Sequence, residues 1–269
     1  TLDPNGTLAT PIFDRVGNAF VVGATETWVN DLTPPTVAIT STASNPTNVS
    51  AIPFKAVFSE HINGLLSTEI TIVNGTLGTF STADDITYDF TVTPTIDGDV
   101  IVSIPGTTCK DDAGNDNTAS STSTIKSDRT RPSVTITTPI STTNASPIPV
   151  TIQFSEDVTG FTLGDINVSG IGTASALTAV SGNQYTFNFT PTTDGTITVN
   201  VPDDVCTDAA TNNNTAAIQL TIKSDRTLPQ LYSVSIASNN THPDYVGIGG
   251  IVTLTITASE DIDITGVLI

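Results

Sequence analysis

Residues 126–132 read Lys-Ser-Asp-Arg-Thr-Arg-Pro, and residues 223–229 read Lys-Ser-Asp-Arg-Thr-Leu-Pro, so one segment recurs after 97 residues. A divergent copy, Asp-Leu-Thr-Pro-Pro, occupies residues 31–35, another 97 residues towards the N-terminus. Each copy lies between stretches of alternating apolar and polar residues, and its proline fixes φ and removes a backbone donor. The segment is therefore predicted to be a short, stiff linker between repeated domains.

The 97-residue period predicts how the 269 residues are divided into domains. We expect residues 35–132 and 133–229 to be two complete repeats. We expect residues 1–34 to be the C-terminal strands of a preceding domain, and residues 230–269 to be the N-terminal strands of a further one.

Apolar residues alternate with polar ones along both repeats, which is typical of strands with one buried face. In the second repeat the alternating apolar positions are Val134 and Ile136; Val150, Ile152 and Phe154; Tyr185, Phe187 and Phe189; Ile197, Val199 and Val201; and Ile218, Leu220 and Ile222. The first repeat matches this pattern except in its last strand, where Ser121 and Ser123 take the places of Ile218 and Leu220. About seven short strands in roughly 100 residues favour an all-β fold, namely tandem immunoglobulin-like β-sandwiches joined by short stiff linkers.

The chain is strongly acidic, with 27 Asp and Glu against 8 Lys and Arg and a formal net charge of −19. This balance argues against nucleic acid as a partner and against anionic membrane surfaces, and it favours cations. No apolar run is long enough to span a bilayer, so no direct membrane insertion is expected for this segment. Cys109 and Cys206 are equivalent positions in successive repeats, too far apart for a disulfide with each other, and are expected to be buried; the alternative is an intermolecular disulfide.

Threading seven strands alternately brings the linker that enters each domain to the same end as the loops after the second and sixth strands. Three sets of carboxylates are then predicted to converge: Asp31, Glu60, Asp111 and Asp112; Asp128, Glu156, Asp157 and Asp208; and Asp225 with Glu260. Packed carboxylates repel one another unless a cation lies between them. Ca²⁺ suits such a set because it takes six to eight oxygen ligands in flexible geometry, whereas zinc would require His or Cys.

Other interpretations of these residues remain open. Asp and Asn are ordinary turn residues, so for any single carboxylate a solvated turn is as good an explanation as metal ligation. Acidic pairs could also imitate a glycosidase dyad, but they lie on repeated linker loops. We find no nucleophile elbow, phosphate-binding loop or zinc-protease helix, so the chain is not expected to be an enzyme.

Several motifs recur in the same order in both repeats. They include Phe-Ser-Glu at residues 58–60 and 154–156, and Thr-Pro-Thr-x-Asp-Gly at residues 93–98 and 190–195. With Thr-Gly-Phe-Thr-Leu-Gly-Asp at 159–165 and Asp-x-Ala-Gly-Asn at 111–115, the chain resembles the tandem bacterial Ig-like domains of large repetitive surface proteins, such as biofilm-associated proteins and giant adhesins. The second repeat departs from this pattern at Thr211, which replaces Gly114. The resemblance implies calcium at domain junctions, where it stiffens the rod.

The expected role is a non-catalytic stalk or spacer of an extracellular adhesin or matrix protein, stiffened by Ca²⁺ at its linkers, with neighbouring Ig-like modules as partners. An alternative is a subunit of an extracellular filament, in which the incomplete terminal domains of different copies complete one another's sheets. A third possibility, accessory domains of a secreted enzyme, depends on flanking sequence.

Overall fold

β-Strands account for almost all of the regular structure, as the alternating pattern predicts. The computed structural model describes residues 15–18, 30–263 and 265. Within that range the only helical pieces are two 3₁₀ turns, Ser67–Glu69 and Leu163–Asp165. No helix in the described residues has the length and apolarity needed to cross a membrane. The chain divides into two compact units, one extending to Thr130 and including Ala209–Asn212, and the other comprising the remainder from Arg131 onward.

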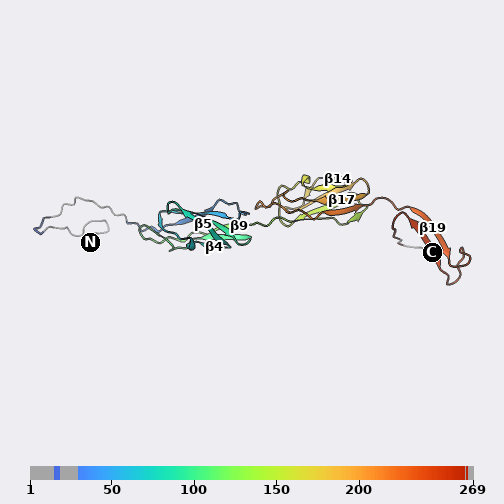
Figure 1. Cartoon of the computed structure of the whole chain (residues 1–269), viewed down its shortest axis with the longest axis horizontal. Helices are drawn as coiled ribbons and strands as arrows, with labels where there is room; N and C mark the ends of the chain where they lie inside the picture. Colours follow the sequence, from blue (N-terminus) through green and yellow to red (C-terminus); the bar gives the residue numbers. More distant parts are fainter. Residues whose placement is uncertain (1–14, 19–29, 264, 266–269) are drawn as a thin grey trace. The chain divides into compact units, whose positions relative to one another are not determined.

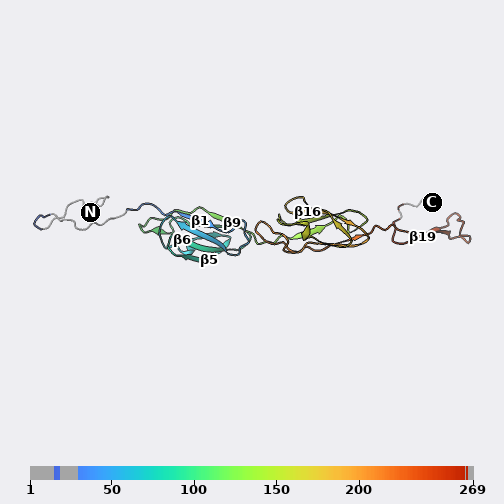
Figure 2. The same cartoon turned by 90° about the horizontal axis from the view of Figure 1, so that it is seen from above.

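The first unit contains two facing sheets and a short strand pair (Figure 1). One sheet has the order β1 (Val37–Ser41), β2 (Ile52–Phe58), β6 (Thr87–Pro94) and β5 (Gly75–Thr82), and β1, β6 and β5 are labelled in Figure 2. The other sheet has the order β4 (Thr71–Val73), β7 (Gly98–Ser103) and β9 (Ser123–Ser127). A short pair is formed by β3 (Ile62–Asn63), which comes directly after β2 in the chain, and β8 (Lys110–Asp111), which comes directly before β9.

A hydrophobic core fills the space between these sheets because alternate residues of each strand point inward. Phe54 and Phe90 stack with ring centroids 5.7 Å apart, and Phe58 and Tyr88 form a T-shaped pair with ring centroids 5.9 Å apart. Cys109 is buried and unpaired, as expected. The core fixes the ends of β2 and β8; Glu60 follows shortly after β2, and Asp111 is the last residue of β8.

The second unit has the same plan. One sheet contains β10 (Val134–Thr137), β12 (Ile148–Phe154), β16 (Gln184–Pro191) and β14 (Gly172–Ala174), and β15 (Thr178–Ala179) also pairs with β16. The other contains β11 (Thr142–Thr143), β18 (Leu220–Ser224), β17 (Gly195–Asn200) and β13 (Asn167–Ser169). Figure 1 labels β14 and β17, which belong to different sheets. Its core has the same kind of residues as the first, and Cys206 is buried and unpaired.

The last strand of the second repeat differs from the sequence prediction. β18 begins at Leu220, and Ile218, which was expected to lie in the strand, is 91 % exposed. The apolar residue at that position does not reach the core because the chain is still in the preceding irregular segment. The first repeat has Ser121 at the position of Ile218, so this departure of its sequence carries little structural cost, whereas Ser123 takes the position of Leu220, which packs against the core of the second unit.

Residues beyond the second repeat form an antiparallel hairpin of β19 (Leu231–Ser238) and β20 (Val252–Ala258). Several of its apolar side chains are exposed, among them Val234, Ile236 and Leu254. Most of residues 1–34, which are predicted to be the C-terminal strands of a preceding domain, lie outside the described part of the chain.

A buried asparagine shapes the loop after β8 in the first unit. The Asn117 side-chain oxygen accepts from the backbone N–H groups of Thr108 and Cys109, at 2.9 and 3.0 Å. Its amide donates to the carbonyls of Pro105 and Thr118, at 3.0 and 2.9 Å. Asn214 makes the equivalent bonds in the second unit. Four satisfied bonds from one buried side chain fix the loop that carries the candidate site.

Candidate functional site

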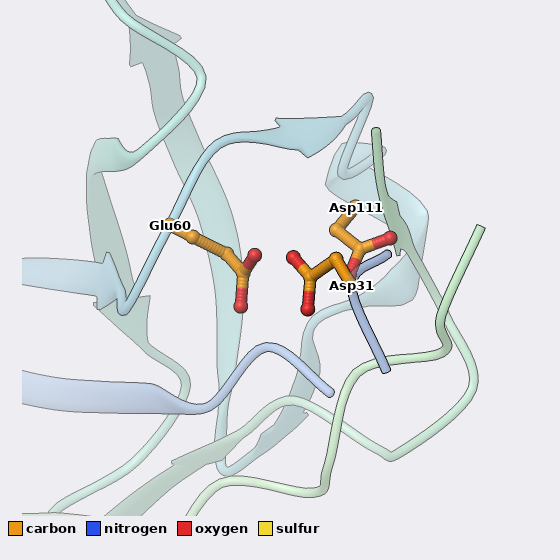
Figure 3. Close-up of side chains that lie close together, drawn as sticks. All are labelled: Asp31, Glu60 and Asp111. Carbon is orange, nitrogen blue, oxygen red and sulfur yellow. The ribbon is translucent and has the colours of Figure 1, made fainter. Parts of the chain in front are cut away.

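Three carboxylates from distant parts of the first unit lie together at one end of the sandwich. One ligand oxygen from each of Asp31, Glu60 and Asp111 lies within 4.8 Å of the others. Asp31 belongs to the linker, Glu60 follows β2, and Asp111 ends β8. Figure 3 shows the carboxylates of Glu60 and Asp31 pointing toward each other, with Asp111 beside Asp31. The three segments converge as the threading of the strands predicts.

The loop after β8 places Asp111 and ties it to the linker. Asp111 is only 2 % exposed, and its carboxylate accepts from the backbone N–H of Asn115 at 2.8 Å and from the Asn115 amide at 2.7 Å. The same amide donates to the carbonyl oxygen of Asp31 at 3.1 Å. Gly114 has φ +93°, a left-handed conformation that glycine adopts without a side-chain penalty. The Asp-x-Ala-Gly-Asn motif therefore folds a tight loop that holds two of the three acidic residues.

The linker carboxylate is oriented by its own backbone. Asp31 accepts from the N–H of Thr33 at 2.9 Å, which is the local turn that Asp commonly forms with the residue two positions on. Thr118 N–H donates to the carbonyl of Pro35 at 2.9 Å and fixes the end of the linker. The linker is thus held at both ends of the segment 31–35.

The electrostatics of the cluster differ between its members. Partial loss of solvent, followed by the charges of Asp31 and Asp111, raises the pKa of Glu60 above its usual value. Burial also acts to raise the pKa of Asp111, but hydrogen bonds from Asn115 and from backbone N–H groups outweigh it and hold that pKa below its usual value. Asp111 is therefore ionised at neutral pH, and Glu60 bears the repulsion.

Basic groups near the cluster pair with other acids. His61 Nδ1 lies 3.2 Å from Asp112 Oδ1, and Lys110 Nζ lies 2.5 Å from Asp116 Oδ1. Among the described residues, no lysine, arginine or histidine forms an ion pair with Asp31, Glu60 or Asp111. The cluster opens into a hollow that is also lined by His61, Asp112 and Ala113. The repulsion therefore has no counter-charge from the described side chains.

The equivalent residues of the second repeat are divided between the two units. Within the second unit, carboxylate oxygens of Glu156 and Asp208 lie within 4.8 Å of each other, and Asp208 is 4 % exposed. In the first unit, Asp128 donates its backbone N–H to the carbonyl of Thr47 at 2.8 Å, and its carboxylate accepts from Thr130 N–H at 3.3 Å. The turn made by Asp31 with Thr33 is therefore repeated by Asp128 with Thr130.

The remaining predicted site residues lie outside these clusters. Asp112 pairs with His61, and the carboxylate of Asp157 lies against Gly182, where a Cβ atom would come within 2.6 Å of its Oδ1. Asp225 lies 3.8 Å from Lys223 Nζ, and Glu260 is exposed. None of the four belongs to a group of three clustered acids among the described residues.

Two further carboxylates were not singled out from the sequence. Asp97 and Asp194 belong to the recurring Thr-Pro-Thr-x-Asp-Gly motif, and each accepts hydrogen bonds from the linker that leaves its own domain. The signal was present, because both the Asp-Gly turn and the linker recur after 97 residues.

Comparison with known proteins gives a family match over most of the chain. A family model described as a bacterial Ig-like domain matches twice in tandem, at residues 31–126 and 128–224. No curated protein sequence matches.

Solved structures give weaker matches. The structure of Yersinia pseudotuberculosis InvD is 15 % identical with a TM-score of 0.34, covering 77 % of this chain and 63 % of that one. The Yersinia pseudotuberculosis adhesin InvE is 14 % identical with a TM-score of 0.27, covering 71 % of this chain and 58 % of that one. A tetra-tandem repeat from the extending region of a large adhesion protein is 15 % identical with a TM-score of 0.33, and the match covers 92 % of this chain and 68 % of that one. The chain thus spans less than two thirds of the two Yersinia structures.

Proposed function

This chain belongs to the family of bacterial Ig-like domains. We propose that it is a non-catalytic spacer segment of an extracellular, repetitive surface protein and that Ca²⁺ stiffens its linkers. One observation carries the proposal: the carboxylates of Asp31, Glu60 and Asp111 meet where the linker enters the domain. An adhesin or matrix stalk needs domains that repeat along the chain and linkers that resist bending. Adding repeats would lengthen such a stalk without changing its parts.

The donor set fits a calcium ion. It offers carboxylate oxygens from three segments. The Asn115 amide also positions the linker residue Asp31 by donating to its carbonyl oxygen. When bound, the ion would supply the positive charge that offsets repulsion among the three acids. Asp111 is fixed by hydrogen bonds before any ion binds, so it would form the rigid part of the site. Glu60 and Asp31 would close the site from the loop after β2 and from the linker.

The same chemistry is proposed for the linker of residues 128–132. Asp128, Glu156 and Asp208 are the counterparts of the first three acids by their place in the repeat. The acids Asp112, Asp157, Asp225 and Glu260 remain candidates from sequence alone. A site whose members come from the linker and from the following domain would reduce linker motion when occupied, since bending would pull the ligands apart.

The test is thermal unfolding and small-angle scattering of the whole chain with calcium and with chelator. Extracellular modules bind calcium with Kd of about 10⁻⁴ to 10⁻³ M, so ~10 mM calcium can stabilise the folded state by about 2.7 kcal/mol at the tighter end. We expect a higher melting temperature and a more extended scattering profile in calcium. Identical profiles and melting temperatures in the two buffers would contradict the proposal.

A second candidate function is a filament subunit that assembles by strand complementation. The observation that favours it is the exposed apolar face of the β19–β20 hairpin, to which Val234 and Ile236 contribute. Such a face needs partner strands to exclude water. Sedimentation velocity over a wide concentration range separates this candidate from the spacer, because a chain that stays monomeric throughout does not form filaments.

A further inference from the structure

Each complete repeat has an Asp-Gly turn that lies beside the linker leaving the same domain. In the first unit the turn follows β6, where Asp97 precedes Gly98, the first residue of β7. The linker leaves from β9, which ends at Ser127 and pairs with β7. The pairing of Gly98 with Ser127 brings the turn and the linker together, although they are about thirty residues apart in sequence.

The Asp97 carboxylate binds the first linker residues through both of its oxygens. Asp97 Oδ1 accepts from the backbone N–H of Arg129 at 3.1 Å and lies 3.5 Å from Arg129 Nε. Asp97 Oδ2 accepts from the Thr130 hydroxyl at 2.6 Å. Hydrogen bonds to an ionised acceptor are stronger than neutral ones, so these bonds matter more than the exposed ion pair.

The second unit repeats the arrangement. Asp194 accepts from the backbone N–H groups of Arg226 and Thr227, at 2.6 and 3.2 Å, and from the Thr227 hydroxyl. The Arg226 guanidinium also donates to the carbonyl of Pro191 at 3.0 Å. Hydrogen bonds from the threonine hydroxyl and from linker N–H groups lower the pKa of both Asp97 and Asp194, so both carboxylates are ionised at neutral pH. In both copies the aspartate accepts from the backbone N–H of the linker arginine and from the hydroxyl of the linker threonine.

We propose that Asp97 and Asp194 are latches, each of which fixes the first residues of the leaving linker onto its own domain without any bound cation. The latch goes beyond the proposed calcium site, because its contacts come from the domain before the linker. It orders the Arg129–Thr130 and Arg226–Thr227 peptide bonds, which would otherwise be exposed cleavage sites for proteases that cut after arginine. A protease must bind several residues in extended form, so cleavage requires the latch to open first.

Trypsin digestion of the whole chain in chelator tests the latch. Cleavage after Arg129 and after Arg226 is quantified separately by mass spectrometry, and the Arg131–Pro132 bond is protected by its proline. Because the opened fraction sets the rate, Asp97→Ala is expected to raise cleavage after Arg129 about tenfold and to leave cleavage after Arg226 unchanged. Asp194→Ala should give the reverse, and neither substitution alters the residues that trypsin recognises.

Three further variants keep the test decisive. Thr130→Val and Thr227→Val remove the hydroxyl donors and should raise cleavage at their own linkers only. Asp89→Ala removes an exposed carboxylate that pairs with Lys55 and should change neither rate. Equal cleavage rates in the wild type and all variants would overturn the latch, as would a rise at both linkers together. Because chelator is present throughout, the result does not depend on whether calcium binds.

Discussion

The side-chain amide of Asn115 holds the linker by donating to the carbonyl oxygen of Asp31 at 3.1 Å, although the two residues are 84 positions apart. The same amide donates to Asp111, so one side chain ties the linker to the loop after β8. The contact recurs 97 residues later, where the Asn212 amide donates to the carbonyl of Asp128 at 2.9 Å. Both of these residues belong to the first compact unit. The linker is therefore positioned by an asparagine as well as by acids.

Replacing Asn115 by alanine should loosen this attachment. The two side-chain hydrogen bonds are lost, and we expect the free energy of unfolding of the domain to fall by about 1–2 kcal/mol. Chemical denaturation in chelator measures the change independently of calcium. Asn167→Ala, at an exposed position on β13, is the matched control and should be near neutral. A loss for Asn115→Ala no larger than for the control would show that the contact contributes nothing to stability.

The two repeats differ at one loop position in a way that predicts opposite effects of exchange. Gly114 and Thr211 are equivalent, and both have positive φ, +93° and +69°. A β-branched residue pays for this conformation, whereas glycine does not, although glycine loses more chain entropy on folding. Thr211→Gly is therefore expected to stabilise its domain by about 1 kcal/mol, and Gly114→Thr to destabilise the other by a similar amount. Denaturant midpoints measure both, and the same sign for the two substitutions would contradict the argument.

Much of this architecture was predictable from the sequence because the repeat is long and the strands alternate regularly. The period located the linkers, and the threading placed Asp31, Glu60 and Asp111 at one end. Side-chain direction was less accessible: Asp112 and Asp157 each come one residue after a clustered acid, Asp111 and Glu156, and a one-residue step turns a side chain to another face. The exposure of Ile218 has a similar cause, since periodicity does not show where a strand begins. The latch residues were missed because turn formation already explained an Asp before a Gly.

Two buried serines predict a gain in stability on removal of a hydroxyl. Ser127 and Ser224 are fully buried at equivalent positions, and in the described residues neither hydroxyl has a hydrogen-bond partner. A buried polar group without a partner costs free energy, so Ser127→Ala and Ser224→Ala should each stabilise by about 1 kcal/mol. Thermal melts of the single variants measure this. A clear loss of stability would show that each hydroxyl has a partner, such as a buried water molecule.

Glu60 provides a test in which calcium reverses the sign of the effect. Its folded-state pKa is raised, first by loss of solvent and then by Asp31 and Asp111, so ionised Glu60 destabilises the domain when no cation is bound. As the pH falls through this raised pKa toward the unfolded value, the wild type takes up a proton more readily when folded and gains stability. In chelator at neutral pH, Glu60→Gln should therefore melt at a higher temperature than the wild type, and it should lack the gain in mildly acidic buffer.

In calcium the order should reverse. The wild type keeps a third carboxylate for the ion, whereas Glu60→Gln loses one charge from the donor set, and so its melting temperature should rise less on adding calcium. Asp99→Asn, which removes an exposed charge on β7, is the control and should respond to calcium as the wild type does. If Glu60→Gln melts below the wild type in chelator, ionised Glu60 does not destabilise the cation-free domain, and the argument from its raised pKa fails. If the two respond equally to calcium, Glu60 is not a ligand, and the cation site must be built from the linker and the loop after β8 alone.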